Sequence, residues 1–336
     1  MSTPIRIGLI GTGRVGQVHA RSVAAIDDAE LTWVCDPFVE GARALAARHG
    51  GRVTADAGDV FAADDVDAVI IASPTPTHVA LIAAALDAGV PALCEKPIDL
   101  DIDKVDTLRA RAAASTVPFA LGFNRRFDPH FAALHRRVVE GDIGRLEQLA
   151  ITSRDPAPQA KEYVESSGGI FRDMTIHDLD MARFFVPDIV EVTARGANQF
   201  DAAARELRDY DAVQLILRGA GDELITITNS RHSAYGYDQR LEAFGDRGLL
   251  QVGNVGPDVV RGYFERSVEA AGPYHSFFVE RYVDAYRLEL VEFLKAVRGE
   301  TSTSPGFEDG RAALVLANAG QEAARTGASV RVDLSA

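Results

Sequence analysis

Two residues in the middle of the chain have the types and spacing of an acid–base pair. Asp173 and His177 stand four residues apart, so on a helix their side chains lie one turn apart on the same face. A carboxylate beside an imidazole fixes its tautomer and raises its basicity, as a general base requires. The same spacing also suits a helix whose polar side carries only solvated charges. The catalytic interpretation therefore depends on which other residues accompany the pair.

The segment that carries the pair, Gly168–Phe185, is predicted to be helical. Gly168 and Gly169 form a break that can deliver the chain to a helix start. Apolar side chains then recur at roughly helical spacing. They are Ile176, Leu179, Met181, Phe184 and Phe185. This pattern places both candidate residues on one helix.

The start of the chain has the pattern of a dinucleotide-binding turn. The apolar run Ile5–Ile10 is typical of a parallel strand that is covered on both faces, and a helix is predicted over 15–25. Between them stands G-x-G-x-x-G, whose glycines allow a tight turn, close approach of a pyrophosphate and close helix–strand packing. The residues of the motif are Gly11, Thr12, Gly13, Arg14, Val15 and Gly16.

An acidic residue at the expected distance completes this motif. The next predicted strand, 31–35, ends at Asp36, 20 residues after Gly16. A carboxylate at this position accepts both ribose hydroxyls of the adenosine and repels a 2′-phosphate. The residues that follow, Pro37 and Phe38, include no arginine to neutralise such a phosphate. The sequence therefore predicts NAD rather than NADP as the cofactor.

Polar residues follow the next buried run, 67–72. Ser73, Thr75 and His78 come directly after it. Because ligands bind at the carboxyl ends of parallel strands, we expect these residues to border the cofactor. His78 fits equally well as a helix-start residue with a purely structural hydrogen bond.

A charged pair ends the predicted strand 90–94. Glu95 and Lys96 follow it directly, and Pro97 holds Lys96 in an extended conformation. Charges at the end of a buried strand are hard to explain as surface decoration. We therefore expect Glu95 and Lys96 to contact the cofactor, with Lys96 at the edge where the nicotinamide lies.

The length and the order of elements indicate two domains. A chain of 336 residues exceeds the usual size of a single core. Strands and helices alternate over 1–123, which predicts an α/β dinucleotide-binding (Rossmann) domain. From 124 to 336 consecutive strands appear, and runs such as Leu224–Thr228 alternate apolar and polar residues. We therefore predict a second, α+β domain built on a mostly antiparallel sheet.

Charge and composition exclude several partners. The chain has 35 Lys and Arg against 49 Asp and Glu, a net charge of −14, which argues against nucleic-acid or anionic-membrane binding. No apolar run approaches the ~20 residues that span a bilayer, and we expect no metal-ligand cluster. Cys35 and Cys94 lie inside apolar runs, and the N-terminus shows no signal-peptide pattern. We predict a cytoplasmic protein.

Together these motifs resemble the glucose-fructose oxidoreductase/inositol dehydrogenase/rhizopine catabolism (Gfo/Idh/MocA) family. The resemblance lies in Gly11–Gly16, Asp36, Glu95–Pro97 and Asp173–His177 and extends nearly from end to end. Four longer strings look like the bacterial inositol 2-dehydrogenase branch of that family. They cover 122–128, 152–156, 167–183 and 235–240.

This resemblance implies further site residues and an assembly. Arg125, Asp155 and Tyr237 match positions of the substrate pocket, although Arg125 also suits an ion pair and Tyr237 an ordinary strand aromatic. Some inositol dehydrogenases have histidine and asparagine where this chain has Ser153 and Asp155, which affects the choice of stereoisomer. The resemblance also implies a large, open sheet whose free face makes subunit contacts, commonly in a homotetramer.

The resulting hypothesis is NAD-dependent oxidation of a polyol, namely myo-inositol to its 2-keto form. His177 would take the hydroxyl proton, Asp173 would orient His177, and Lys96 would hydrogen-bond the reacting oxygen. Another cyclitol or a sugar, such as scyllo-inositol or an aldose, is the nearest alternative substrate. A nucleotide-binding sensor without catalysis is a more distant one. Met1–Pro4 is too short to wrap a permanently held cofactor, as sugar-exchanging relatives do.

Overall fold

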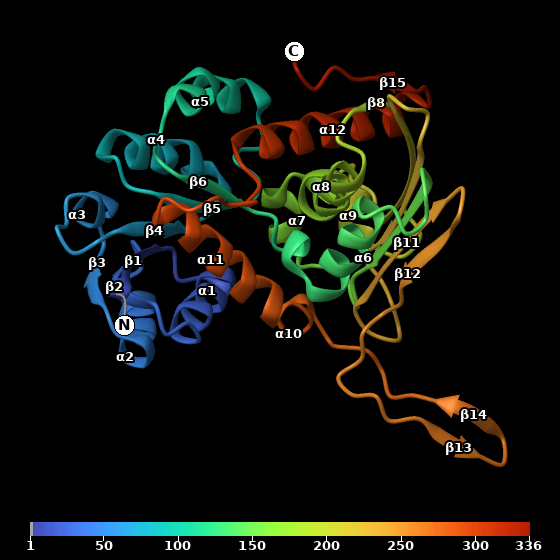
Figure 1. The fold of residues 1–336 in the computed structure, drawn as a ribbon, viewed down its shortest axis with the longest axis horizontal. Helices are drawn as coiled ribbons and strands as arrows, with labels where there is room; N and C mark the ends of the chain where they lie inside the picture. The colour runs from blue at the N-terminus through green and yellow to red at the C-terminus, as the bar shows by residue number, and fades with distance from the viewer. Residues whose placement is uncertain (1–2) are drawn as a thin grey trace. The chain divides into compact units, whose positions relative to one another are not determined.

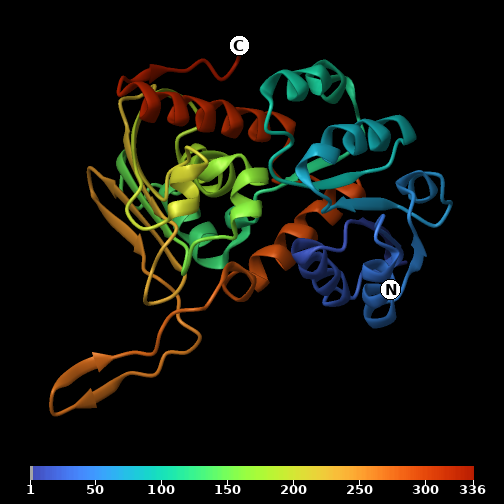
Figure 2. The same cartoon turned by 180° about the vertical axis from the view of Figure 1, so that it is seen from behind.

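The computed structural model describes residues 3–336 and divides into two compact units (Figures 1 and 2). The first unit runs to Asp128 and also contains Val283–Leu314, whereas the second comprises Pro129–Tyr282 and Val315–Ala336. The late segment joins the first unit because Leu290, Phe293 and Leu294 belong to its hydrophobic core. The predicted division at 123/124 stays a prediction about domain boundaries.

A six-stranded parallel sheet forms the first unit, in the order β3-β2-β1-β4-β5-β6. The order changes direction between β1 and β4, the place where open α/β sheets bind their ligands. The strands are β1 Ile5–Ile10, β2 Ala29–Cys35, β3 Arg52–Thr54, β4 Ala68–Ile71, β5 Ala92–Glu95 and β6 Phe119–Gly122. The helices include α1 Arg14–Ala24, α2 Val39–His49, α3 Ala57–Phe61, α4 His78–Ala88, α5 Ile102–Ala114 and α11 Val283–Val297.

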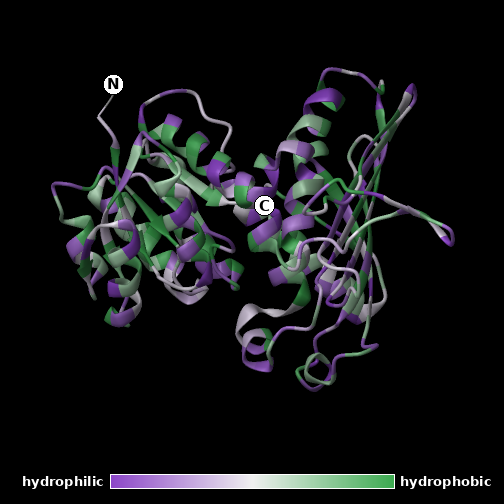
Figure 3. Ribbon diagram, turned by 90° about the horizontal axis from the view of Figure 1, so that it is seen from below, coloured by the Kyte–Doolittle hydropathy of each residue, from purple (hydrophilic) through white to green (hydrophobic). Residues whose placement is uncertain are grey.

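Apolar residues on both faces of this sheet explain its parallel arrangement. Ile7, Leu9 and Ile70 are completely buried in one core with residues of α1, α2 and α11. A strand covered on both faces needs apolar side chains in succession, as β4 has in Ala68–Ile71. In Figure 3 the strands of this unit are accordingly mostly hydrophobic.

The second unit is built on a seven-stranded mixed sheet with the order β12-β11-β7-β10-β9-β8-β15. Only β7 and β10 pair in parallel among these described strands, and the other neighbours are antiparallel. The strands are β7 Leu146–Arg154, β8 Ile189–Ala197, β9 Ala212–Gly219, β10 Leu224–Ser230, β11 Asp238–Gly245, β12 Gly248–Val252 and β15 Val330–Arg331. The predicted fold class is thus confirmed.

One face of this sheet is covered by helices, as the alternating pattern requires. Ile225 and Ile227 are buried, whereas Leu224, which belongs to the opposite face of the same strand, is 46% exposed. Figures 1 and 2 show the helices of this unit on one side of the sheet. They are α6 Pro129–Val139, α7 Lys161–Ser167, α8 Ile176–Phe185, α9 Ala202–Glu206, α10 Phe278–Arg281 and the end of α12 Phe307–Thr326.

Two features of the second unit differ from the sequence-based expectation. The predicted helix 168–185 is interrupted, because Phe171–Thr175 forms a π-helical turn before α8 begins. In addition, β13 Gly262–Phe264 and β14 Ser267–Ala270 form a separate hairpin. The sequence there has no alternation of apolar and polar residues that would have predicted these strands. Figures 1 and 2 show this hairpin extending away from the seven-stranded sheet.

The glycine-rich turn gives a prediction about stability. A side chain at Gly16 would overlap the carbonyl oxygen of Gly11, so the tight helix–strand contact requires glycine there. Gly16→Ala should lower the free energy of unfolding of the first unit by about 1–3 kcal/mol, as overpacking does. Urea denaturation measures this change.

Gly13→Ala is the matched control within the same motif. No described atom lies within 4 Å of a Cβ built at Gly13, and its φ of −62° suits any residue. Equal destabilisation by both substitutions would contradict the packing explanation.

Candidate active site

The glycine-rich turn is shaped for a phosphate group. Gly11 has φ +100°, and a Cβ there would lie 2.5 Å from the backbone of Ala72 and Ser73. Its N–H donates to the carbonyl oxygen of Cys35 at 2.8 Å, which ties the turn after β1 to the end of β2. Gly13 precedes α1 and leaves open space beside the first N–H groups of that helix. These donors and the helix dipole fit the pyrophosphate of a dinucleotide.

Asp36 is fixed at the end of β2 by donors from its own unit. Its Oδ2 accepts hydrogen bonds from the N–H and the hydroxyl of Thr12 at 2.8 and 2.7 Å. Its Oδ1 accepts the N–H of Phe38 at 2.8 Å. Both lone pairs of Oδ2 are thereby engaged, whereas Oδ1 has one left, so Asp36 can still accept a ribose hydroxyl. The residues present therefore fit NAD.

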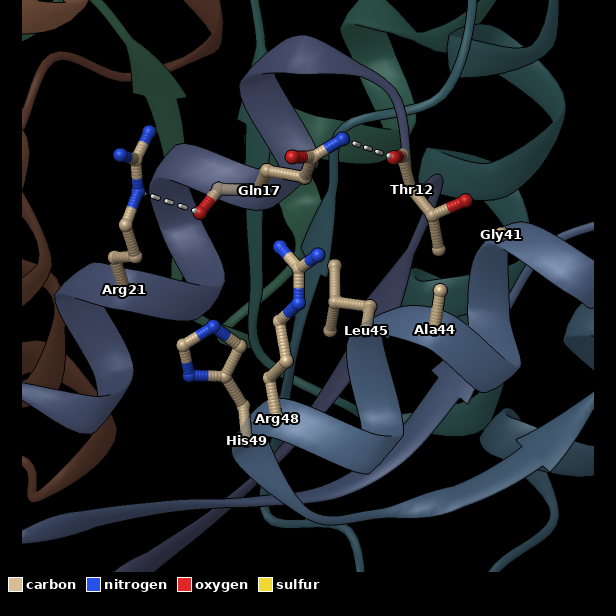
Figure 4. Close-up of a pocket in the computed structure, with 8 residues that line it drawn as sticks. All are labelled: Thr12, Gln17, Arg21, Gly41, Ala44, Leu45, Arg48 and His49. Atoms are coloured by element: carbon tan, nitrogen blue, oxygen red, sulfur yellow. Dashed lines mark hydrogen bonds between the residues drawn. The ribbon is translucent and has the colours of Figure 1, made fainter.

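A surface pocket of about 200 Å³ lies between α1 and α2 next to Thr12 (Figure 4). Its described lining contains no carboxylate, and of the predicted cofactor residues only Thr12 lines it. Arg21 and Arg48 stand in the last turns of α1 and α2, where cations complement the helix dipoles. This explains the basic lining without a ligand. The lining residues are Thr12, Gln17, Arg21, Gly41, Ala44, Leu45, Arg48 and His49.

His78 is enclosed and bridges two loops of the first unit. Its Nδ1 lies 2.8 Å from the carbonyl oxygen of Pro97, and its Nε2 lies 2.8 Å from that of Ser73. Carbonyl oxygens only accept, so both contacts are hydrogen bonds when both ring nitrogens carry a proton. The ring is 1% exposed. These bonds match the structural role for His78, and contact of Ser73, Thr75 or His78 with the cofactor stays a prediction.

Glu95 is bonded to a histidine of the same unit, His19, to which the sequence motifs gave no role. Its Oε1 lies 2.8 Å from Nε2 of His19 in α1, and both side chains are buried. Gly122 packs against the carboxyl group, because a Cβ there would lie 3.1 Å from Cδ of Glu95. The pair thereby links α1 to the strand end that precedes Lys96. Gly16 and His19 are three residues apart and so lie on the same face of α1, the face that Gly16 packs against the sheet. This spacing was the available signal that His19 is buried.

Arg125 occupies a short 3₁₀ turn, Asn124–Phe127, that follows β6 and is buried. Its neighbour Arg126 donates to Asp309 at 2.9 Å, so Arg126 has a structural partner within the first unit. The predicted substrate role of Arg125 stays a prediction.

In the second unit, Asp173 lies on the π-helical turn and His177 in the first turn of α8. A π turn closes its hydrogen bonds over five residues, so the ordinary four-residue geometry assumed for the pair does not apply. Asp173 accepts the hydroxyl of Tyr163 at 2.8 Å through Oδ1 and Nη1 of Arg231 at 3.1 Å through Oδ2. No sequence pattern indicated these two partners.

A buried polar network fixes the start of α8. The hydroxyl of Ser153 lies 2.6 Å from Oδ1 of Asp178, and Nδ2 of Asn229 donates to Oδ2 at 2.7 Å. Thr175 in turn donates to Oδ1 of Asn229 at 2.6 Å. The network ties α8 to β7 and β10, and Asp178 is the immediate neighbour of His177. Acidic residues on both sides of a histidine at a helix start were a possible signal.

Tyr237 and Asp155 lie at the ends of strands in this unit. Tyr237 is 4% exposed, its N–H donates to the carbonyl oxygen of His275 at 2.8 Å, and its ring packs edge-on against Tyr282. The N–H of Asp155 donates to the carbonyl oxygen of Ser230 at 2.9 Å. Substrate contact by either side chain stays a prediction.

Comparison with protein families decides the classification. Residues 5–123 match the oxidoreductase family with an NAD-binding Rossmann fold, and residues 131–251 match the GFO/IDH/MocA C-terminal domain. The chain belongs to the Gfo/Idh/MocA family. It is therefore an oxidoreductase with NAD as cofactor, as the glycine motif and Asp36 predicted.

Several Gfo/Idh/MocA relatives are similar over nearly the whole chain. An inositol 2-dehydrogenase of Rhizobium meliloti (strain 1021) is 43% identical, with 94% of this chain and 95% of the relative covered. A myo-inositol 2-dehydrogenase of Thermotoga maritima is 38% identical, with 98% and 99% covered. The crystal structure of a myo-inositol dehydrogenase from Corynebacterium glutamicum ATCC 13032 has a TM-score of 0.95 at 55% identity, with 98% and 99% covered.

The described residues of this family member include neither a membrane-spanning helix nor a metal-binding cluster. Every helix among residues 3–336 is too short or too polar to cross a membrane. Within the same residues, no group of three or more His, Cys, Asp or Glu side chains is arranged to hold a metal ion.

The geometry around Asp36 predicts the cofactor preference. Asp36→Ala removes an acceptor of charge-assisted hydrogen bonds, each of which contributes about 1.5–3 kcal/mol, so kcat/KM for NAD should fall about 10-fold or more. The loss of the negative charge should leave NADP use unchanged or improved. Initial rates with both cofactors measure the ratio.

Asp64→Ala is the control, since Asp64 is exposed and remote from the turn in sequence. An unchanged NAD-to-NADP ratio in Asp36→Ala would contradict the role of Asp36.

Proposed function

We propose that this enzyme oxidises myo-inositol to its 2-keto form and transfers the hydride to NAD. The observation that carries the proposal is the set of relatives named inositol 2-dehydrogenase or myo-inositol 2-dehydrogenase, at 43% and 38% identity over nearly full length. The chain has Lys96, Asp173 and His177 in the motifs that carry the resemblance. All three are groups that bind or move protons, as alcohol oxidation requires.

The chemistry divides between the cofactor and three side chains. NAD supplies the acceptor for the hydride that leaves the carbon. His177 takes the proton from the hydroxyl, so that the C–O bond becomes a carbonyl as the C–H bond breaks. Asp173 stabilises the imidazolium that forms, and Lys96 donates a hydrogen bond to the same oxygen as negative charge develops on it.

Substrate orientation would come from side chains that hydrogen-bond the other hydroxyls. Arg125, Asp155 and Tyr237 are the proposed contacts, because they provide donors and an acceptor suited to a polyol. Ser153 is less suited to such contact, since it is 1% exposed and its hydroxyl is bonded to Asp178.

scyllo-Inositol is the second candidate substrate. A scyllo-inositol dehydrogenase from Lactobacillus casei, whose structure holds NAD(H) and scyllo-inositol, has a TM-score of 0.91 at 29% identity, with 99% of this chain and 100% of that chain covered. Its similarity shows that the two activities occur on closely related folds. The higher identity to the myo-inositol enzymes favours myo-inositol.

Initial rates of NADH formation with myo-inositol, scyllo-inositol and an aldose test the proposal directly. We expect the largest kcat/KM with myo-inositol and NAD. NADH binding without turnover of myo-inositol would contradict the proposed substrate, while the family and the cofactor would stand. Turnover of scyllo-inositol alone would favour the second candidate.

His177→Ala tests the assignment of the base. The loss of a general base lowers kcat by about 10²–10⁴-fold, whereas the affinity for NADH should change little because the nucleotide motif lies in the other unit. His232→Ala is the matched control, as His232 is an exposed histidine of the same unit. A kcat for His177→Ala equal to that of the control would contradict the assignment.

We also propose that the enzyme is a cytoplasmic homotetramer. Both cysteines are buried and free, which fits a reducing compartment. The hairpin β13–β14 and the segment that leads into it form an arm that exposes Val259, Val260 and Val268 at 89%, 70% and 77%. An isolated two-stranded hairpin is marginally stable in water, so this arm needs cover, which a second copy of the chain would provide.

Charges placed on this arm test the assembly. Val260→Asp with Val268→Asp should dissociate the tetramer into smaller species, because burying two carboxylates in an apolar contact is strongly unfavourable. Light scattering after size-exclusion chromatography gives the mass. Glu265→Ala at the hairpin tip is the control. A monomeric unmodified enzyme, or a tetramer that tolerates both aspartates, would contradict the proposal.

A further inference from the structure

Arg231 is one of the largest side chains that the fold encloses completely. It follows β10, its N–H donates to the carbonyl oxygen of Asp211 at 2.9 Å, and its side chain is 0% exposed. An arginine stays charged in any protein environment, and a buried charge is strongly unfavourable unless opposite charges compensate it. The role of Arg231 can therefore be inferred from the acidic residues that compensate its charge.

Three carboxylates act electrostatically on the guanidinium. Nη1 of Arg231 donates to Oδ2 of Asp173 at 3.1 Å. Burial lowers the pKa of Arg231, but the attraction of Asp173, Asp155 and Asp209 outweighs it, so that the pKa is raised overall. Arg231 is thus the shared counter-charge of an acidic group that includes two proposed site residues, Asp155 and Asp173.

The same acidic group holds the turn that precedes His177. Asp209 accepts the N–H of Ile170 through both oxygens at 3.1 and 3.0 Å. Gly169, at φ +82°, packs so closely that a Cβ would lie 2.7 Å from Oδ1 of Asp209. Asp209 therefore anchors the start of the π-helical turn, and Asp173 lies in its middle. π-Helical turns occur frequently at functional sites.

Tyr163 completes the restraint on Asp173. Its hydroxyl donates to Oδ1 at 2.8 Å, while Arg231 holds Oδ2. Partial burial and then the negative charge of Asp173 raise the pKa of the phenol, so Tyr163 stays protonated and remains a donor. Each oxygen of Asp173 thereby accepts a hydrogen bond from a different residue, which fixes the plane of the carboxylate.

We propose that Arg231 is a positioning residue for hydride transfer, which holds Asp173 as an ionised and oriented carboxylate and acts on His177 only through it. The inference rests on the proposed function. Asp173 can stabilise an imidazolium only as an anion, and Arg231 opposes its protonation. Tyr163 supports the same orientation from the other oxygen.

A double-mutant cycle between Arg231 and Asp173 tests this inference, with kcat for NADH formation as the readout. Arg231→Lys keeps the charge but loses the guanidinium geometry, and Arg231→Gln keeps a donor but loses the charge. Each should lower kcat about 10- to 100-fold, as loss of a charge-assisted hydrogen bond does. In an Asp173→Asn background the same substitutions should lower kcat less than about 2-fold further.

Two further variants make the cycle decisive. Arg240→Lys is the matched control, since Arg240 pairs with Asp238 at 2.9 Å and is partly exposed. It should leave kcat unchanged in both backgrounds. Tyr163→Phe removes only the second partner of Asp173 and should also lower kcat in the unmodified enzyme but not in Asp173→Asn.

Additive losses in the Asp173→Asn background would overturn the proposal, because a merely structural arginine affects the enzyme independently of that carboxylate. Failure of both Arg231 variants to fold, judged by circular dichroism, would also overturn it and make Arg231 structural. Full kcat in Asp173→Asn would do the same. The proposed function is judged separately, by NADH formation from myo-inositol in the unmodified enzyme.

Discussion

The buried bond between Glu95 and His19 is the contact that joins the glycine-rich turn of the first unit to the strand end before Lys96. It joins α1, which follows the glycine-rich turn, to the last residue of β5, directly before Lys96. Both side chains are buried, so breaking the bond would leave buried polar atoms without a hydrogen-bond partner, which is unfavourable. The cofactor-binding turn and Lys96 therefore belong to one rigid arrangement rather than to two independent loops.

The second unit uses the same physical device with different residues. Asp178 is bonded to Ser153 and Asn229, and Asp173 to Tyr163 and Arg231, so His177 lies between two anchored carboxylates along the chain. Buried polar groups are costly when unbonded, which makes such networks specific for one arrangement. The two residues that flank His177 in these networks, Asp173 and Asp178, are thus each held by more than one hydrogen bond.

What could be predicted from sequence was the local part of this design. The glycine turn, Asp36 and the ends of buried strands depend on residues near one another in the chain, and the family resemblance extended them. The pairing of His19 with Glu95 spans 76 residues, and that of Asp173 with Arg231 spans 58. No periodicity connects such residues. The π turn escaped prediction for a related reason, since apolar spacing beyond it still fits an α-helix.

The choice between inositol stereoisomers is the finest distinction that the proposed substrate residues would make. Enzymes for myo- and scyllo-inositol distinguish substrates that differ in the direction of one hydroxyl, and a site built to hydrogen-bond that hydroxyl rejects the isomer that leaves its groups unbonded. Ser153 is enclosed and bonded to Asp178, which leaves Asp155 as the departure from relatives that is suited to face a substrate. Asp155 also adds to the attraction on Arg231. Asp155 and Asp173 are therefore electrostatically linked through one buried arginine.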